Sequence, residues 1–463
     1  MRCSRSSRIE LDNNSPFGVL VAKQCVRLDT SAMIAEIHRS VCERATGNSS
    51  RVSVFSPNLL VRFAFYASIV AIPFTELYLP GTGDRIGVIR IVQALILAGA
   101  ISQPRICLRY VPAALLWFVA YCGLRIAWGL WLSPELSADW WPSTVQWLEW
   151  FLPWLWIMFN LLQFPNLSRK GLWAFVGTAA FCALLHLAGI GTAEVAGNEG
   201  RSSVFGQNAN VIGANYGIAL IVLTAIGMLR DVKLSQRLLA IPLAGLLGIG
   251  LAKTGSRTGM LIALAGVVVL LFQARSFLPR VQRYAVLALI AAVIALILYQ
   301  MPVVVKRLEN VASSSRRPEE ARARMFPVLW EIFLRNPIYG SGPDQYQFEL
   351  TRRAMPYLVA EQRTISAHNL LLLLLVETGV IGLLLFSLGL KDALIAAWRA
   401  RKKSLGWLPL ALIVPLVTAG ATVSNPSSSP IFWFAIAYAL SGGGASHICE
   451  ESLRAGNPSG VLV

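Results

Sequence analysis

The stretch that decides the fold is ISAHNLLLLLLVETGVIG, residues 365–382. A polar His368–Asn369 pair opens a run of six leucines, and Glu377 lies within the apolar sequence that follows. Immediately before it, residues 302–366 form the long hydrophilic interruption in the apolar part of the chain. This order predicts a membrane-spanning helix that begins where a long extramembrane loop ends. An imidazole at such a boundary could transfer protons, and a hydrogen-bonded interfacial histidine without a catalytic role is the alternative.

The composition excludes a soluble globular protein. Of the 463 residues, 55% are hydrophobic and 14% are charged, and long apolar runs recur along the chain. The net charge of +17 would suit a nucleic-acid-binding protein, but most basic residues lie in tails and short loops beside apolar runs, where positive charge fixes topology. We therefore expect an all-α polytopic integral membrane protein, with membrane lipids and no nucleic acid among its partners.

The apolar runs predict about 12 transmembrane helices. Their expected positions are residues 59–79, 86–103, 112–132, 145–164, 171–190, 209–229, 237–252, 258–273, 283–301, 367–390, 405–422 and 430–443. Nine helices thus fall in 59–301 and three in 367–443, on either side of one large loop at 302–366 that contains short helices. The chain begins with a basic tail at 1–58, which lacks a signal-peptide core and which we expect to be disordered, and ends with a tail at 444–463.

Lysine and arginine residues indicate the orientation. They cluster in short loops on one side of the predicted membrane, for example at Arg105, Arg169, Arg230, Arg280 and Arg399. By the positive-inside rule this side is cytoplasmic. Both tails are then inside, and the 302–366 loop is outside.

Two short outer loops carry basic residues against this topology signal. Arg201 lies in GRSSVFGQNANVIG (200–213), and Arg257 lies in KTGSRTG (253–259) with Ser256 beside it. A helix N-terminus favours anions, and the planar fork of arginine matches phosphate oxygens. The alternative is that these arginines only reach lipid headgroups.

Other substrate-binding candidates have weaker signals. Arg90 and Arg125 are buried by position near the outer ends of the second and third predicted helices, where either could extend an anion site or pair with Glu377. For Glu377, a structural ion pair is the favoured interpretation. Arg324 lies in an amphipathic segment, RARMFPVLWEIFLR (322–335), where a solvated or core-lining role is the alternative. The sequence contains no D-x-D, H-E-x-x-H or P-loop motif, so we expect neither a metal nor a cofactor.

Several ordered motifs together resemble the O-antigen ligase and polymerase superfamily of bacterial polytopic membrane proteins. The motifs are an arginine-bearing loop followed by F-x-x-N (Phe205, Asn208), a GSR-x-G element, R-x-x-x-x-x-W (Arg324, Trp330), NPIYGSGPDQY (336–346) and AHN–leucines–VETGVIG. The resemblance covers roughly residues 200–390. These motifs are fairly specific for the superfamily but discriminate poorly among its members.

The resemblance implies glycosyl transfer from an undecaprenyl-diphosphate-linked glycan at the periplasmic face of the bacterial inner membrane. In ligases the acceptor is lipid A–core, in polymerases another repeat unit, and in related oligosaccharyltransferases a protein. The positions that match the essential arginines of the family are Arg201 and Arg257, and the position that matches its essential histidine is His368.

The chemistry of these side chains agrees with that function. Arginines can stabilise a leaving diphosphate without a metal, and a histidine can act as the general base for the acceptor hydroxyl or only position the acceptor. Direct attack would invert the anomeric configuration. Asn208, Ser256 and Asn369 are further substrate-binding candidates. A transporter of lipid-linked glycans is the competing class, but it would be expected to show two corresponding halves, and no internal repeat is found.

Overall fold

The computed structural model describes residues 56–75, 77, 87–132, 140–194, 202–228, 234–274, 318–354, 367, 369–402, 406–420 and 429–455. The chain divides into two units, one made of Met1–Ser56 with Ser446–Val463 and the other of Pro57–Ala445, and the second contains the candidate site. The predicted span at 283–301 lies outside the described residues, as do Arg201 and His368.

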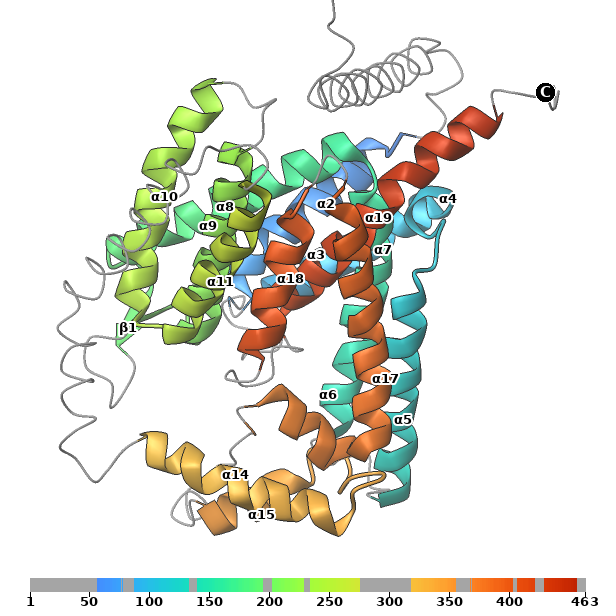
Figure 1. The fold of residues 1–463 in the computed structure, drawn as a ribbon, viewed down its shortest axis with the longest axis vertical. Helices are drawn as coiled ribbons and strands as arrows, with labels where there is room; N and C mark the ends of the chain where they lie inside the picture. Colours follow the sequence, from blue (N-terminus) through green and yellow to red (C-terminus); the bar gives the residue numbers. More distant parts are fainter. Residues whose placement is uncertain are drawn as a thin grey trace, which may run out of the picture. The chain divides into compact units, whose positions relative to one another are not determined.

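Most of the described chain is helical (Figure 1). The longer helices are α2 (Leu59–Val70), α3 (Val88–Ser102), α5 (Ala113–Leu132), α7 (Leu152–Leu162), α8 (Pro165–Leu187), α9 (Ala209–Met228), α10 (Leu234–Thr254), α11 (Arg257–Ala274), α14 (Pro318–Arg335), α15 (Tyr346–Ala354), α17 (Leu370–Ala400), α18 (Leu408–Ala419) and α19 (Pro430–Ala455). Shorter pieces are the 3-10 turn η2 (Ile72–Phe74), α4 (Pro104–Cys107), α6 (Trp140–Gln146) and the π-helical turn η3 (Trp147–Phe151).

Two short strands depart from the purely helical expectation. Strands β1 (Thr192–Glu194) and β2 (Ser202–Val204) pair antiparallel, with Thr192 opposite Val204 and Glu194 opposite Ser202. The hairpin follows α8 and leads into α9, so it occupies the loop in which the sequence places Arg201.

In the part of the chain that the structure describes, five helices are long and apolar enough to cross a membrane, namely α5, α8, α9, α10 and α17. Shorter apolar helices, among them α2, α3, α11, α18 and the first part of α19, lie on other predicted spans. The chain is therefore an all-α, multi-pass membrane protein, while the number of about 12 spans stays a prediction.

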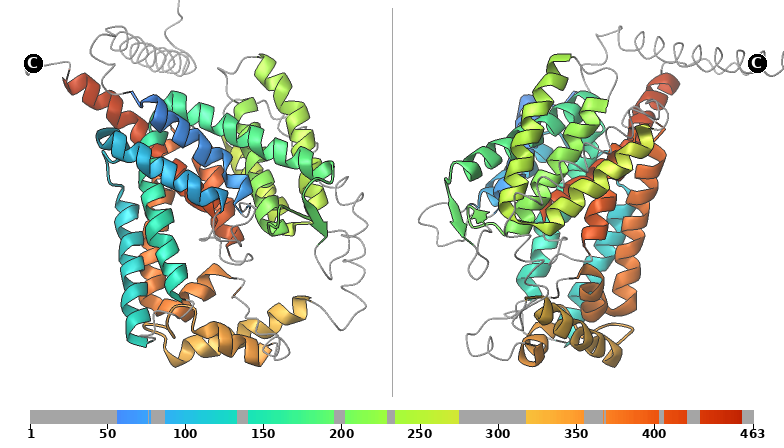
Figure 2. Two further views of the ribbon diagram at one scale, coloured as in Figure 1. Left: turned by 180° about the vertical axis from the view of Figure 1, so that it is seen from behind. Right: turned by 60° about the vertical axis from the view of Figure 1, so that its left-hand side comes forward.

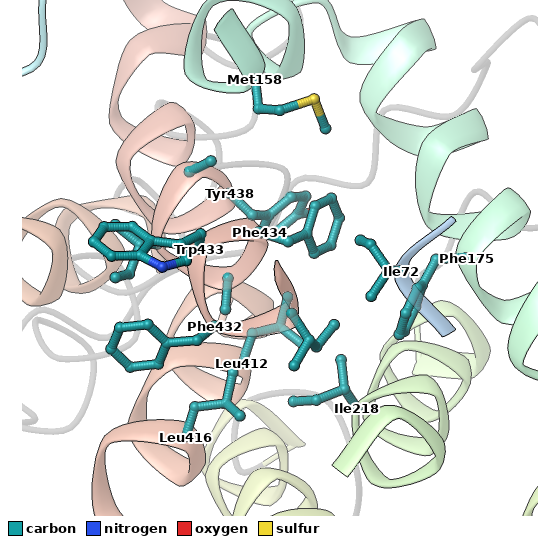
Figure 3. Packing of buried hydrophobic residues seen from close by; sticks show 14 of the residues in the cluster. Ile72, Met158, Phe175, Ile218, Leu412, Leu416, Phe432, Trp433, Phe434 and Tyr438 are labelled. Carbon is teal, nitrogen blue, oxygen red and sulfur yellow. The ribbon is translucent and has the colours of Figure 1, made fainter. Parts of the chain in front are cut away.

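The first part of α19 lies at the centre of the main hydrophobic core. All residues from Ile431 to Leu440 are buried, as expected for a helix that is apolar on every face. Figure 3 shows its aromatic side chains packed among residues of α7, α8, α9 and α18. The Trp433 ring stacks on Phe151 with centroids 5.7 Å apart and meets Phe118 of α5 edge-on at 5.1 Å.

Helices α5 and α17 run antiparallel and lie side by side in all views (Figures 1 and 2). A Cβ atom on Gly389 of α17 would lie 2.7 Å from the Phe118 ring of α5, so the glycine allows the two helices to approach closely. One helical turn further along the pair, Phe386 packs edge-on against Tyr121 at 5.5 Å.

Helix α17 is kinked at Gly379, which has φ 65° and ψ −164°. Only glycine adopts this conformation readily. Before the kink, the leucine run packs on α14 and α15, where Leu373 and Val376 share a small core with Leu329 and Leu350. The span expected at 367–390 thus lies on α17, which is long and apolar enough to cross a membrane. Neither its kink nor the packing of its first part on α14 and α15 was expected from the sequence.

Candidate functional site

Helices α9 and α11 are parallel and begin side by side. Their backbones touch at glycines, because a Cβ atom on Gly259 would lie 2.5 Å from the carbonyl carbon of Gly213, and one on Gly217 would lie 2.7 Å from the Gly259 oxygen. Gly213 and Gly217 form a G-x-x-x-G pattern, which lets membrane helices approach closely. The starts of α9 and α11 therefore lie at the same end of the bundle.

Helix α18 brings the start of α17 to this end as well. It runs antiparallel to α11, since Phe272 near the end of α11 stacks on Trp407 just before α18 with centroids 6.2 Å apart. The opposite end of α18 thus lies level with the start of α11. There the Gly420 carbonyl accepts a hydrogen bond of 2.8 Å from the backbone N–H of Leu370, the first residue of α17. We call this region, marked by Asn208, Ser256 and Gly420, the cap end.

The helices that start at the cap end each carry a capping side chain. The Asn208 side chain accepts from the Asn210 N–H at 2.9 Å, Ser256 accepts from the Gly259 N–H at 3.1 Å, and Asn369 accepts from the Leu371 and Leu372 N–H groups at 3.0 and 3.1 Å. Helix N-termini carry partial positive charge, so three neighbouring ones favour an anion. The substrate contacts predicted for these three residues stay predictions. Helix capping is a second role of the same side chains.

A turn of two residues joins α10 to α11 and presents Arg257. Gly255 has φ 59°, and the buried Ser256 donates its hydroxyl hydrogen to the side-chain oxygen of Asn210 at 3.1 Å. This bond ties the α10–α11 turn to the start of α9. Arg257 is the exposed first residue of α11, where it adds a full charge to the helix dipole.

A second polar cluster ties the hairpin to the same turn. The Ser202 hydroxyl donates to the Lys253 carbonyl at 3.2 Å and lies 2.5 Å from Nε2 of His186, and Lys253 Nζ donates to the His186 carbonyl at 2.7 Å. Ser202 directly follows Arg201 in the sequence, and Lys253 lies four residues before Arg257. The hydrogen bond between Ser202 and Lys253 therefore joins the two segments. The segments of the two predicted arginines are thus brought together, although Arg201 itself lies outside the described residues.

Sequence reasoning missed His186 and Ser202 and noted Lys253 only as an exception to the topology signal. His186 is buried, and its Nδ1 atom has no hydrogen-bond partner among the described residues. The available signal was a single ionisable residue inside an apolar run, which is by default a pointer to function in membrane proteins.

The residues on both sides of His368 are fixed in place. Ala367 is buried and donates its N–H to the hydroxyl oxygen of Tyr346 at 3.1 Å, and Asn369 caps α17. Burial raises the pKa of Tyr346 well above its ordinary value of 10, so the phenol remains neutral. His368 itself lies outside the described residues.

The remaining candidates differ in their surroundings. Arg125 is buried and forms ion pairs with Glu377 and, at 3.7 Å, with Asp344. The ion pair expected for Glu377 is therefore confirmed. Arg90, in contrast, is exposed near the start of α3, so its expected burial was wrong. Arg324 lies in α14, but its side chain is not among the described parts.

Comparison with known families places part of the chain. Residues 242–387 match the family model described as O-antigen ligase. The matched segment begins within α10 and ends within α17, so it includes Ser256, Arg257, Arg324, His368 and Asn369, whereas Arg90, Arg125, Arg201 and Asn208 precede it. A search of curated proteins found no match.

Proposed function

The segment 242–387 belongs to the O-antigen ligase and polymerase superfamily, and from this membership we propose that the protein is an O-antigen ligase-like glycosyltransferase. It moves a glycan from undecaprenyl diphosphate to an acceptor, lipid A–core or a similar glycolipid. The reaction takes place at the periplasmic face of the bacterial inner membrane. Ligases and polymerases of this superfamily both act on lipid-linked glycans, so the donor class is the firmer part of the proposal.

The observation that carries the proposal is the convergence of helix starts at the cap end. The hydrogen bonds of Ser256 to Asn210 and of Ser202 to the Lys253 carbonyl hold the Arg201 hairpin and the Arg257 turn together. A diphosphate leaving group needs preorganised positive charge, and fixed dipoles with arginine forks supply it without reorganisation. In this role Arg201 and Arg257 bind the diphosphate.

His368 acts as general base in the transfer step. The acceptor hydroxyl oxygen forms a bond to the anomeric carbon, and its proton passes to the imidazole. The bond from the anomeric carbon to the diphosphate oxygen breaks, and the diphosphate leaves with the electron pair, stabilised by the two arginines. No metal takes part. A single displacement inverts the anomeric configuration, so a product that retained it would contradict the direct attack.

Surface-glycan profiling of a deletion strain tests the proposal. The strain is complemented with wild type, His368→Ala, Arg257→Ala or the matched control Arg399→Ala, which changes an exposed arginine in the last turn of α17. At equal membrane levels, we expect His368→Ala and Arg257→Ala to lower transfer by about a hundredfold or more, as for the loss of one stabilising donor. We expect Arg399→Ala to leave transfer unchanged.

The glycan pattern separates the related activities. Loss of long glycan from lipid A–core with polymer accumulating on undecaprenyl diphosphate identifies a ligase. Single repeat units that remain attached to the acceptor identify a polymerase of the same superfamily. Normal glycans in both site variants would overturn the catalytic assignment and favour a transporter of lipid-linked glycans.

A further inference from the structure

The motif NPIYGSGPDQY (336–346) and the kink of α17 at Gly379 form one unit. Backbone groups of 336–346 replace the helical hydrogen bonds that the kink of α17 breaks. Val380 donates its N–H to the Pro337 carbonyl at 2.9 Å, and the N–H of Ser341 donates to the Val376 carbonyl at 2.7 Å. The outer-loop turn is therefore joined to the kink of α17 by backbone hydrogen bonds.

Glycines on both sides make this contact possible. Gly340 has φ 73°, and a Cβ atom there would lie 2.6 Å from the backbone of Glu377 and Thr378. A Cβ atom on Gly379 would lie 2.3 Å from the carbonyl oxygen of Ile338. The two backbones are thus packed directly against each other, and neither position tolerates a side chain without a shift.

Arg125 of α5 joins both parts of this unit. Its guanidinium forms ion pairs with Glu377 on the kink and with Asp344 on the turn, and the Asp344 N–H donates to the Glu377 carboxylate at 3.3 Å. The exposed fractions of the three side chains are 6% for Arg125, 2% for Glu377 and 15% for Asp344. A guanidinium held by two carboxylates and shielded from solvent is poorly placed to bind a substrate diphosphate as well.

The segment that the kink orients begins next to His368. From Leu370, the first residue of α17, to Gly379 at the kink, the helix advances by about 14 Å at a rise of ~1.5 Å per residue. A rotation of roughly 10° at the kink would therefore move the start of this segment by about 2 Å. Misplacement of a reacting group by ~1 Å can lower a rate about a hundredfold.

We infer that Arg125 is a positioning residue, which acts through Glu377 and Asp344 to hold the kink of α17 at the angle that places His368. This inference rests on the proposed function and replaces the substrate-binding role that the sequence suggested for Arg125. It predicts that the contact controls the rate of transfer and not the binding of the donor.

The test compares three variants of the contact with a matched control in proteoliposomes. The variants are Glu377→Gln, Arg125→Lys and Gly340→Ala, and the control is Glu149→Gln, which neutralises an exposed carboxylate in η3. Gly340→Ala disturbs the interlock without changing a charge. The probes are the undecaprenyl-diphosphate-linked glycan and the lipid A–core of the producing strain, with the donor titrated. Hydrogen exchange of peptides from 336–346 and 370–382 reports on the kink.

We expect Glu377→Gln and Gly340→Ala to lower kcat at least tenfold with an unchanged KM for the donor. Exchange in the two kink peptides should become faster, while peptides of α9 and α11 remain as protected as in wild type. Arg125→Lys should show the same pattern more weakly, because lysine keeps the charge but cannot contact both carboxylates as a fork. Because Arg125→Lys retains the buried positive charge, this variant still tests the contact if Glu377→Gln fails to fold.

Two results would overturn the inference. A raised KM for the donor with unchanged hydrogen exchange would mean that Arg125 contacts the substrate. Wild-type kcat in Gly340→Ala and Glu377→Gln would mean that the kink does not position His368. His368→Ala in the same preparation keeps the two proposals apart, because its full activity would remove the proposed function itself, whereas its inactivity beside fully active kink variants would remove only the positioning role.

Discussion

The hydroxyl of Ser202 shows how one small side chain connects three segments of the cap end. It contacts the imidazole of His186 at the end of α8 and the carbonyl of Lys253 at the end of α10, and it belongs to β2. Lys253 completes the cluster by donating to the His186 carbonyl. Because all these partners surround the segments of Arg201 and Arg257, the cluster sets how those segments meet.

Ser202→Ala is expected to destabilise the protein by about 1–3 kcal/mol. The substitution leaves the buried Nε2 atom of His186 without its partner, and an unsatisfied buried polar group costs free energy in this range. Ser203→Ala is the matched control, since the Ser203 hydroxyl donates to the Ala193 carbonyl on the exposed side of the hairpin, and its effect should stay within about 0.5 kcal/mol. Thermal unfolding in detergent measures both, and equal midpoints for the two variants would refute the structural role of the cluster.

At the scale of elements, the contact between α9 and α11 determines where the cap end forms. Gly213 and Gly217 of α9 face Gly259 of α11 without intervening side chains. This close approach keeps the two helix starts level, so that their caps and dipoles act on the same region. Further along, Gly266 of α11 fits against Ile221 of α9 and the Ala411 carbonyl of α18, which fixes α18 in the same packing.

Gly213→Ala and Gly227→Ala form a matched pair on α9. A Cβ atom on Gly213 would lie 2.5 Å from Cβ of Ser256, so we expect the variant to push α11 away, to destabilise the protein by about 1–3 kcal/mol and to lower glycan transfer. A Cβ atom on Gly227 meets nothing within 4 Å. That variant should be neutral or more stable by up to about 1 kcal/mol.

Thermal unfolding and the transfer assay check this pair together. The contact between α9 and α11 would lose its assigned importance if Gly213→Ala were as stable and as active as Gly227→Ala.

At the scale of the whole molecule, the orientation of the chain in the membrane decides whether the cap end can meet a periplasmic acceptor. Gln345 lies between α14 and α15, and Lys402 follows α17. The two residues therefore lie beyond opposite ends of the α17 segment that follows the kink. Both residues are exposed. The positive-inside rule predicts that Gln345 is periplasmic and Lys402 cytoplasmic.

Cysteine labelling tests this orientation. In a background without the native cysteines, Gln345→Cys should react with a membrane-impermeant maleimide in intact spheroplasts, and Lys402→Cys should react only after the membrane is opened. Labelling of Lys402→Cys in intact spheroplasts would reverse the orientation and remove the periplasmic site.

The sequence by itself determined that this is a helical membrane protein and which segment resembles a known superfamily. Apolar runs, charge asymmetry and the motifs around Arg257 and His368 are local patterns along the chain, and they suffice to predict membrane helices and a superfamily. The matched segment at 242–387 confirmed the superfamily, although the resemblance had been drawn from about residue 200.

Only the tertiary structure decided which polar residues meet. Arg125 and Glu377 are 252 residues apart, and the conformation of Gly379 depends on the carbonyl of Ile338 that packs against it. No periodicity records such contacts, because they depend on how helices cross and not on the order of residues within one helix. For the same reason Arg90 and Arg125, which looked equivalent in the sequence, proved to be exposed and buried respectively. Helix packing, which brings distant backbones together at glycines, is what turned separate motifs into one cap end.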